Sequence, residues 1–206
     1  MKPAANISQT LRASRPKIIS LVVACFALTY PFLIYIGRNE VSASVFAWLI
    51  LILSVLRFIV MRGAHLRAQR YLFMVTFIVI LLFCASVIVF NQSGLLYYYP
   101  ALMSATVSLL FFSSLAGKQS LIEQLMVAVG KPPPTHAIGY LRGLSLCWGL
   151  FLMINASISA AAACCSTPYF WMLYNGLISY AAMAIFIGVE WLYRLHYKRV
   201  RGLTNA

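Results

Sequence analysis

Long apolar runs separated by short polar segments dominate the chain. A helix needs about 20 mainly apolar residues to cross the roughly 30 Å interior of a bilayer. Four runs have that length, and a further stretch, Gly143–Val189, contains no charged residue and is too long for one span. Ser166-Thr167-Pro168 is the natural reverse turn within it, because Ser or Thr caps a helix start and Pro suits the first turn. The predicted spans are Ile18–Gly37, Val41–Met61, Tyr71–Phe90, Leu95–Gly117, Leu141–Cys165 and Pro168–Tyr193.

This pattern predicts an all-α fold, a polytopic bundle of six transmembrane helices that forms a single domain over residues 1–206. The composition agrees with it. Hydrophobic residues make up 63% of the chain and charged residues 9%, whereas soluble domains carry about 25% charged residues. A soluble domain of this composition lacks the polar groups to cover its surface, while a surface that faces lipid can be apolar.

Sixteen lysines and arginines against three acidic residues give a formal net charge of +13. Nucleic-acid binding is the usual first interpretation of such a balance. Here the basic residues lie in short clusters between apolar runs, so we expect no nucleic-acid partner. With the N-terminus in the cytoplasm, every basic residue except Arg38 falls in a cytoplasmic segment. The positive-inside rule therefore predicts that both termini are cytoplasmic.

The cytoplasmic segment Lys118–Tyr140 has a pattern of its own. Ser120-Leu121-Ile122-Glu123 fits a capping box, and the apolar residues that follow fall on one helical face. We predict a short helix over about residues 120–130 that lies on the inner membrane surface, followed by an extended proline segment. The alternative is an ordinary amphipathic connector. The residues expected to dock a partner are Ser120, Leu121, Glu123, Leu125, Pro132, Pro133 and Pro134.

Acidic residues are too few for most hydrolytic chemistry. Glu40, Glu123 and Glu190 are the three in the chain, which excludes aspartate-rich metal sites, and paired catalytic carboxylates need two close acids. No HExxH, GxSxG or Gly-rich phosphate loop is present. The five cysteines lie in apolar runs without metal-binding spacing, and we expect small buried side chains there. The sequence favours a non-enzymatic protein with no catalytic residue, metal or cofactor.

Glu190 is the first candidate for a functional residue, since an ionisable group in a membrane span marks a functional site by default. Arg194 follows one turn later, in the favourable acid-before-base order. Arg57 and Arg142 are expected at a similar depth. The group is either a structural ion pair at the membrane boundary or an anchor for a lipid headgroup or substrate.

Asn155 and Asn175 are the second candidates. They flank the predicted turn at similar distances, within the similar sequences Asn-Ala-Ser-Ile-Ser and Asn-Gly-Leu-Ile-Ser. We predict that the last two spans form a tight hairpin in which these amides pair with each other, because an amide in hydrocarbon needs a partner. The pair serves either helix–helix adhesion or a polar ligand pocket.

The C-terminal part of the chain resembles a bacterial inner-membrane family encoded among fatty-acid-like polyketide genes, including those for aryl polyene pigments. A more distant resemblance is to the intracellular septation protein A group. The resemblance implies a multi-pass protein of the bacterial inner membrane that works with an acyl-chain or polyene pathway, and it carries over no catalytic residue. The matching features are Ser120-Leu121-Ile122-Glu123, the proline segment, Tyr140-x-Arg142, Trp148 with Asn155, Trp171-x-x-Tyr174-Asn175-Gly176-Leu177-Ile178 and Glu190-Trp191-x-x-Arg194.

Three hypotheses follow for the function. The first is a non-enzymatic accessory protein that docks or hands over an acyl or polyene intermediate, with membrane lipid and cytosolic acyl-chain or polyketide synthases as partners. The second is a small lipid transporter or flippase with a pocket near Asn155, Asn175 and Glu190. The third is a membrane acyltransferase, which the scarcity of acids and histidines disfavours. A lipid-sized groove between helices would favour transfer or transport, and a solid bundle would favour docking.

Overall fold

The structure of the chain, a computed structural model, describes residues 25, 26, 28–61 and 67–200. The basic N-terminal segment, residues 18–24 and 27 of the first predicted span, and residues 62–66 lie outside the described residues. Within the described ranges every regular element is helical, which confirms the all-α prediction.

The helices follow the apolar runs, except that the fourth predicted span, Leu95–Gly117, contains the end of a short helix, Ser93–Leu96, and a separate helix, Tyr99–Leu115. The reverse turn predicted at Ser166-Thr167-Pro168 is present, with the Thr167 hydroxyl accepting a hydrogen bond from the Phe170 N–H at 3.3 Å. The elements are a helical segment Leu28–Gly37, α2 (Ala43–Met61), α3 (Arg67–Phe90), α4 (Ser93–Leu96), α5 (Tyr99–Leu115), α6 (Leu121–Ala128), the 3₁₀ turn η1 (Thr135–Ala137), α7 (Ile138–Cys165), α8 (Pro168–Leu173), the π-helical turn η2 (Tyr174–Ile178) and α9 (Ser179–Val200).

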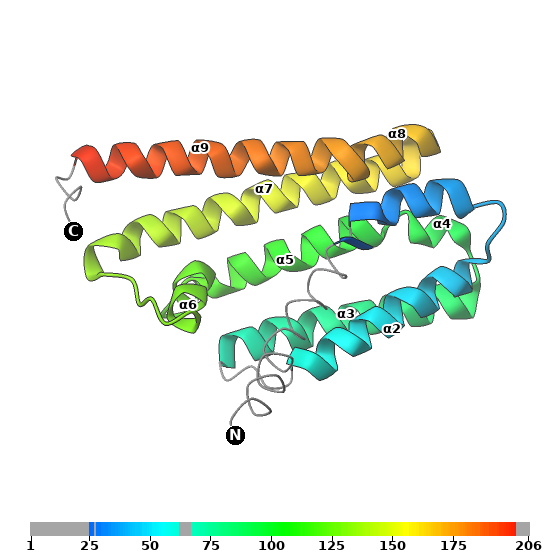
Figure 1. Cartoon of the computed structure of the whole chain (residues 1–206), viewed down its shortest axis with the longest axis horizontal. Coiled ribbons are helices and arrows are strands. Elements are labelled where there is room, and N and C mark those ends of the chain that lie inside the picture. The colour runs from blue at the N-terminus through cyan, green and yellow to red at the C-terminus, as the bar shows by residue number, and fades with distance from the viewer. Residues whose placement is uncertain (1–24, 27, 62–66, 201–206) are drawn as a thin grey trace, which may run out of the picture.

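The long helices form two groups (Figure 1). In one group, α5 packs along α7, and α8, η2 and α9 continue as one helix beside α7. In the other, α2 packs along α3, and α3 reaches the first group through α5 and α6. The short helix α6 crosses the long helices and closes the end of the molecule opposite the α7–α8 turn.

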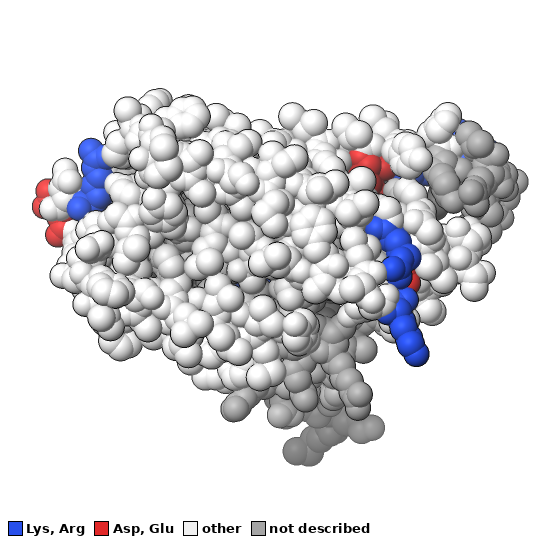
Figure 2. Space-filling view, turned by 180° about the vertical axis from the view of Figure 1, so that it is seen from behind, with Lys and Arg blue, Asp and Glu red and all other residues white. Residues whose placement is uncertain are grey.

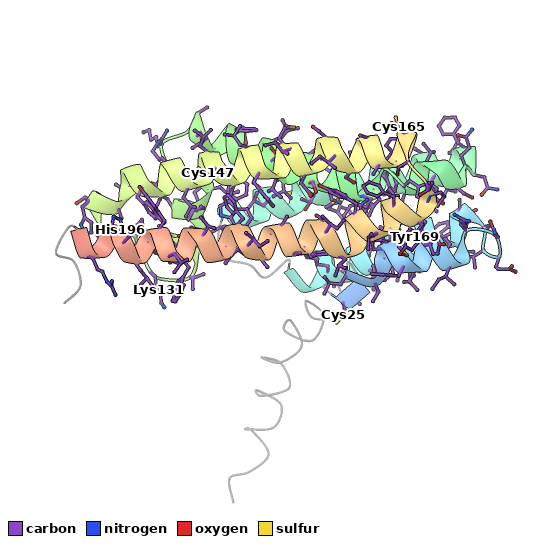
Figure 3. The ribbon with its side chains drawn as sticks, turned by 90° about the horizontal axis from the view of Figure 1, so that it is seen from above. Cys25, Lys131, Cys147, Cys165, Tyr169 and His196 are labelled. Carbon is purple, nitrogen blue, oxygen red and sulfur yellow. The ribbon has the colours of Figure 1, made fainter. Side chains whose placement is uncertain are left out.

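The hairpin of α7 with α8–α9 is tight near its turn and wide at its other end (Figures 1 and 3). Cys165 and Tyr169 lie at the turn, whereas Lys131 and His196 lie at the far end. Large aromatic rings fill the wide part. The Phe186 ring of α9 lies 4.8 Å from the Trp148 ring and 4.9 Å from the Phe151 ring, centroid to centroid. The predicted tight hairpin is therefore right for its turn half only.

Two buried clusters hold the ends of the molecule together. One joins the Leu28–Gly37 helix, α2, α3, α4 and α8 around Tyr30 and Trp171. Both side chains also donate to backbone carbonyls of the α4–α5 connection, Tyr30 to Leu96 at 2.9 Å and Trp171 to Tyr97 at 2.8 Å. The second cluster joins Phe111 to residues of α6 and α7. The groove described below is lined by members of both clusters, including Tyr30 from the first and Phe111 from the second.

The cysteines depart from the expectation of burial. Cys84 is buried in the first cluster, but Cys25, Cys147, Cys164 and Cys165 are exposed. The expectation is wrong for these four because an apolar run does not say which side of the helix faces the bundle.

Where α5 packs against α7, each of the two helices carries a buried serine. Ser108 of α5 donates to the Gly149 carbonyl oxygen of α7 at 2.7 Å, and the Phe112 ring fills the space beside that glycine. A Cβ atom at Gly149 would meet the Phe112 ring at 2.9 Å, so a larger residue there would require the ring to move. One turn earlier on α7, Ser145 is fully buried and its hydroxyl has no hydrogen-bond partner among the described residues.

The two serines provide a matched test of this packing. Ser108→Ala leaves the Gly149 carbonyl without its side-chain donor and is expected to lower the free energy of unfolding by about 1 kcal/mol. Ser145→Ala removes a buried hydroxyl that has no partner, so stability is expected to stay the same or to rise. Thermal unfolding of the purified variants in one detergent measures both. Equal losses in the two variants would contradict this assignment.

Candidate functional site

Two reciprocal Asn–Ser pairs join α7 to the helix that follows it. Asn155 and Asn175 each have a serine four residues later, Ser159 and Ser179. Because the helices are antiparallel, each serine meets the asparagine of the other helix. Ser179 donates to Asn155 Oδ1 at 2.8 Å, and Ser159 donates to Asn175 Oδ1 at 2.6 Å. All four side chains are buried, so these pairs fix the register of the two helices.

The predicted pairing of Asn155 with Asn175 is therefore wrong in its partners. Asn155 bonds to residues other than Asn175, and Asn175 uses its Nδ2 group to donate to the Trp171 carbonyl oxygen at 3.0 Å. The physical premise, that a buried amide must find a partner, holds for both residues. The partner is a serine hydroxyl one turn away on the other helix.

Asn155 connects three helices. Its Oδ1 accepts from the Tyr174 hydroxyl at 3.0 Å as well as from Ser179, and its Nδ2 donates to Ser104 Oγ of α5 at 3.0 Å. Tyr174 and Ser179 are five residues apart, at the two ends of the π-helical turn, where backbone bonds link residues five apart. The turn thus aligns both side chains toward Asn155.

Sequence reasoning missed Tyr174, Ser159 and Ser179 as members of this cluster. The signal for the serines was present as the repeated Asn-x-x-x-Ser spacing, which places the two side chains on one helical face. No sequence signal announced the π-helical turn that brings in Tyr174.

Asn155, Asn175 and Ser179 line part of a long cavity of about 540 Å³. We call this cavity the groove. Its lining comes from the Leu28–Gly37 helix, α2, α3, α5, α6, α7, η2 and α9, and it is mostly apolar and aromatic. Ser104, Asn155, Asn175 and Ser179 contribute polar atoms to it. Arg57 of α2 is the charged residue among the described lining residues. A cavity of this size is within the range of small-molecule sites.

Glu190 forms an ion pair with one of the three arginines that were predicted near its depth. Arg194 Nη2 lies 3.2 Å from Glu190 Oε2 as expected, and the Tyr140 hydroxyl donates to Glu190 Oε1 at 2.7 Å. Arg142 instead donates to the carbonyl oxygens of Leu115 and Gly117 at 2.6 and 3.3 Å, at the C-terminal end of α5. Free carbonyls at a helix end attract a cation. Of the three arginines predicted at the depth of Glu190, Arg194 therefore pairs with it, Arg142 bonds to the end of α5 and Arg57 lines the groove.

Helix α6 confirms the predicted separate helix and its capping box. Glu123 Oε1 accepts from the Ser120 N–H at 3.1 Å and from the Ser120 hydroxyl at 2.6 Å. However, the first turn of α6 packs into the bundle, where Leu121 lies against Phe111 and Leu152, whereas Val127 and Val129 are exposed. Ser120, Leu121 and Glu123 are buried, so these predicted docking residues are inaccessible. The exposed members of the predicted docking set are Leu125, which also lines the groove, and Pro132 and Pro134, with Pro133 half-buried.

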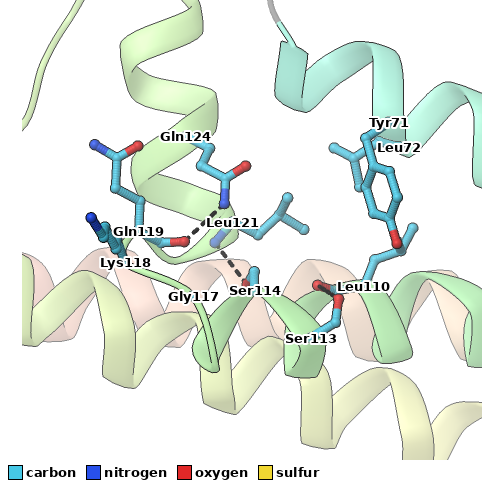
Figure 4. Close-up of a pocket in the computed structure, with 10 residues that line it drawn as sticks. All are labelled: Tyr71, Leu72, Leu110, Ser113, Ser114, Gly117, Lys118, Gln119, Leu121 and Gln124. Carbon is cyan, nitrogen blue, oxygen red and sulfur yellow. Dashed lines mark hydrogen bonds between the residues drawn. The ribbon is translucent and has the colours of Figure 1, made fainter.

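A second cavity, of about 580 Å³, lies between the start of α3, the end of α5 and α6, and we call it the mouth cavity. Figure 4 shows Lys118, Gln119 and Gln124 on one side of it and Tyr71 and Leu72 on the other, with Ser113 and Ser114 along α5. Leu72, Leu110 and Leu121 line both cavities, so the mouth cavity and the groove meet at these three side chains.

In the part of the chain that the structure describes, no group of three His, Cys, Asp or Glu side chains is placed to hold a metal ion. No family model, no curated protein and no solved structure matches the chain. What the site can do is therefore inferred from its own geometry. An apolar groove with buried amides on one wall and a polar cavity at one end has the distribution of polarity that an amphiphile needs.

The cross-paired cluster is tested by a double-mutant cycle. Asn155→Ala and Ser179→Ala remove the two ends of one hydrogen bond, so their effects on the free energy of unfolding are expected to be non-additive by about 0.6–2 kcal/mol. As a control, Asn155→Ala is combined with Ser86→Ala, whose hydroxyl bonds to the Leu82 carbonyl oxygen of its own helix. Additive effects are expected there. A coupling energy of zero for the first pair would rule out the assigned bond.

Proposed function

We propose that the chain is a multi-pass protein of the bacterial inner membrane that spans it six times, with both termini in the cytoplasm. Two helices, Thr135–Cys165 and Pro168–His196, are long and apolar enough to cross a membrane. In their most apolar windows only 33% and 22% of the residues are buried, which differs from core helices of soluble proteins. The proposal assigns the other four spans to shorter apolar helices, Leu28–Gly37, Ala43–Ile59, Met74–Phe90 and Tyr99–Leu115.

The described surface supports a lipid environment. On the face shown in Figure 2, the Lys, Arg, Asp and Glu side chains lie toward the two ends, and a wide uncharged surface separates them. Large apolar side chains are exposed along the helices, including Trp48, Ile52, Leu82, Val89 and Leu109. Monomeric soluble proteins rarely expose large contiguous apolar patches, whereas lipid contact makes such a surface favourable.

Reporter fusions test the six-span arrangement. Alkaline phosphatase is active only outside the cytoplasm, so its activity is expected to alternate along the chain, because each span reverses the side on which the fusion lies. A fluorescent protein that fails to fold outside serves as the control with the opposite readout. Periplasmic activity of a fusion after Tyr193 would overturn the assignment. The fusion points, beginning outside, are Gly37, Met61, Phe90, Gly117, Ser166 and Tyr193.

We infer further that the protein is a non-enzymatic accessory protein that binds an acyl or polyene chain in the groove and hands it over. The observation that carries this proposal is the groove itself, a lipid-sized space lined mainly by apolar and aromatic side chains. Burial of a long apolar chain there is favourable in proportion to the area removed from water. The resemblance to proteins encoded with aryl polyene and fatty-acid-like polyketide genes supplies the class of chain, and cytosolic synthases are the proposed partners.

A lipid transporter or flippase is the second candidate, favoured by Arg57. A charged residue in the wall of a groove at membrane depth is typical of a path for polar groups. An acyltransferase finds no support, because the described residues that line the groove include no His, Cys, Asp or Glu that could act as a general base.

Chain binding is tested with two tryptophan substitutions on α5. Val107 lines the groove, whereas Leu109 is exposed on the other side of the same helix. Val107→Trp fills part of the groove and is expected to weaken binding of a conjugated polyene fatty acid at least about tenfold, a loss of about 1.4 kcal/mol. Leu109→Trp is expected to leave binding unchanged. The polyene fluorescence, titrated against the purified protein in nanodiscs, gives both affinities.

Equal affinity in the wild type and the Val107→Trp variant would mean that the chain binds elsewhere. Absence of any binding above empty nanodiscs would refute the proposed function.

A further inference from the structure

We propose that the mouth cavity binds the anionic headgroup of the amphiphile whose chain occupies the groove. The ligand is then a single-chain amphiphile that ends in a carboxylate or a phosphate. This inference rests on the proposed function, since it assigns the headgroup of the same ligand.

The lining of the mouth cavity has the chemistry of an anion site. Lys118 supplies a positive charge, Gln119 and Gln124 supply amides, and Tyr71 supplies a hydroxyl group. The Ser113 hydroxyl already donates to the Leu110 carbonyl oxygen at 3.0 Å. The described lining of both cavities contains no acidic side chain, and its charged residues are Lys118 and Arg57. An oxyanion accepts hydrogen bonds from ammonium, amide and hydroxyl donors, and a charged donor gives the strongest of these bonds.

Lys118 is the charged donor of this cavity, whereas some of the other polar groups already have partners. Gln124 Nε2 already donates to the Gln119 carbonyl oxygen at 2.8 Å, and Ser114 Oγ both donates to the Phe111 carbonyl oxygen and accepts from the Leu121 N–H. These bonds hold the start of α6 against the end of α5, as Figure 4 shows for the Ser114 and Gln124 contacts. They keep the polar rim in place, while the flexible Lys118 stem can follow a headgroup.

The junction of the two cavities sets the orientation of the ligand. Leu72, Leu110 and Leu121 line both spaces, so a chain that enters the groove passes these leucines and leaves its polar end beside Lys118. Lys118 lies on the side that the proposed topology places in the cytoplasm. The headgroup thus faces the compartment in which acyl chains are made, and the tail remains in the apolar groove.

The test compares headgroups that share one chain. The full-length protein in phosphatidylcholine nanodiscs is titrated with a conjugated polyene fatty acid and with its methyl ester, which lacks the charge. Lys118→Gln is expected to weaken binding of the acid about tenfold, as the loss of one charge-assisted hydrogen bond predicts, and to leave the ester unchanged. Lys131→Gln, an exposed lysine outside both cavities, is the matched control and is expected to change neither affinity.

Competition by a saturated fatty acid and by an alkyl phosphate of equal length identifies the oxyanion, and displacement by either supports an anion site. Equal affinity for acid and ester, unchanged in Lys118→Gln, would overturn the headgroup site while the ester still reports chain binding in the groove. An equal effect of Lys131→Gln would show that Lys118 acts only through the overall surface charge, which would also overturn the headgroup site. Failure of both ligands to bind would instead refute the proposed function.

Discussion

The need of two buried amides for hydrogen-bond partners determines how this bundle is assembled. Asn155 and Asn175 are buried, and each bonds to the serine that follows the other by one helical turn. This cross-pairing works in one antiparallel register only, and the Asn155–Ser104 bond extends it to α5. As a result α5, α7 and the α8–α9 helix form one bonded layer. The α2–α3 pair meets this layer mainly at its ends, and the groove is the space left between them.

The π-helical turn gives the bonded layer its polar face toward the groove. In a regular α-helix, residues five apart do not share a face, so Tyr174 and Ser179 could not both reach Asn155. The wider turn aligns them, and it places Asn175 beside them. Gly176 lies in the same turn, where a Cβ atom would come within 2.6 Å of the Phe32 ring. The irregular turn therefore serves both the amide cluster and the close packing of the Leu28–Gly37 helix.

Features that depend on neighbouring residues were predictable from the sequence, and features that depend on helix rotation were not. The apolar runs, the turn before Pro168 and the capping box of Ser120 with Glu123 are local, and the structure confirms them. The depth of Asn155 and Asn175 was predictable to within one turn, but their partners were not. Arg142 illustrates the limit, because its bonds to the end of α5 depend on where two distant helices meet. Hydropathy alone gives no such position.

Helix α6 shows how a surface prediction changes when packing is known. Its apolar face suggested contact with a membrane or a partner, yet Leu121 lines both cavities and packs against Phe111. The start of α6 is thus part of the wall of both cavities. What remains exposed beside it is the proline segment, whose fixed backbone needs little ordering when it binds. The prolines and several residues of the mouth cavity, Gly117, Lys118 and Gln119, belong to the same segment between α5 and α7, so the proposed docking and headgroup sites share one connection of the chain.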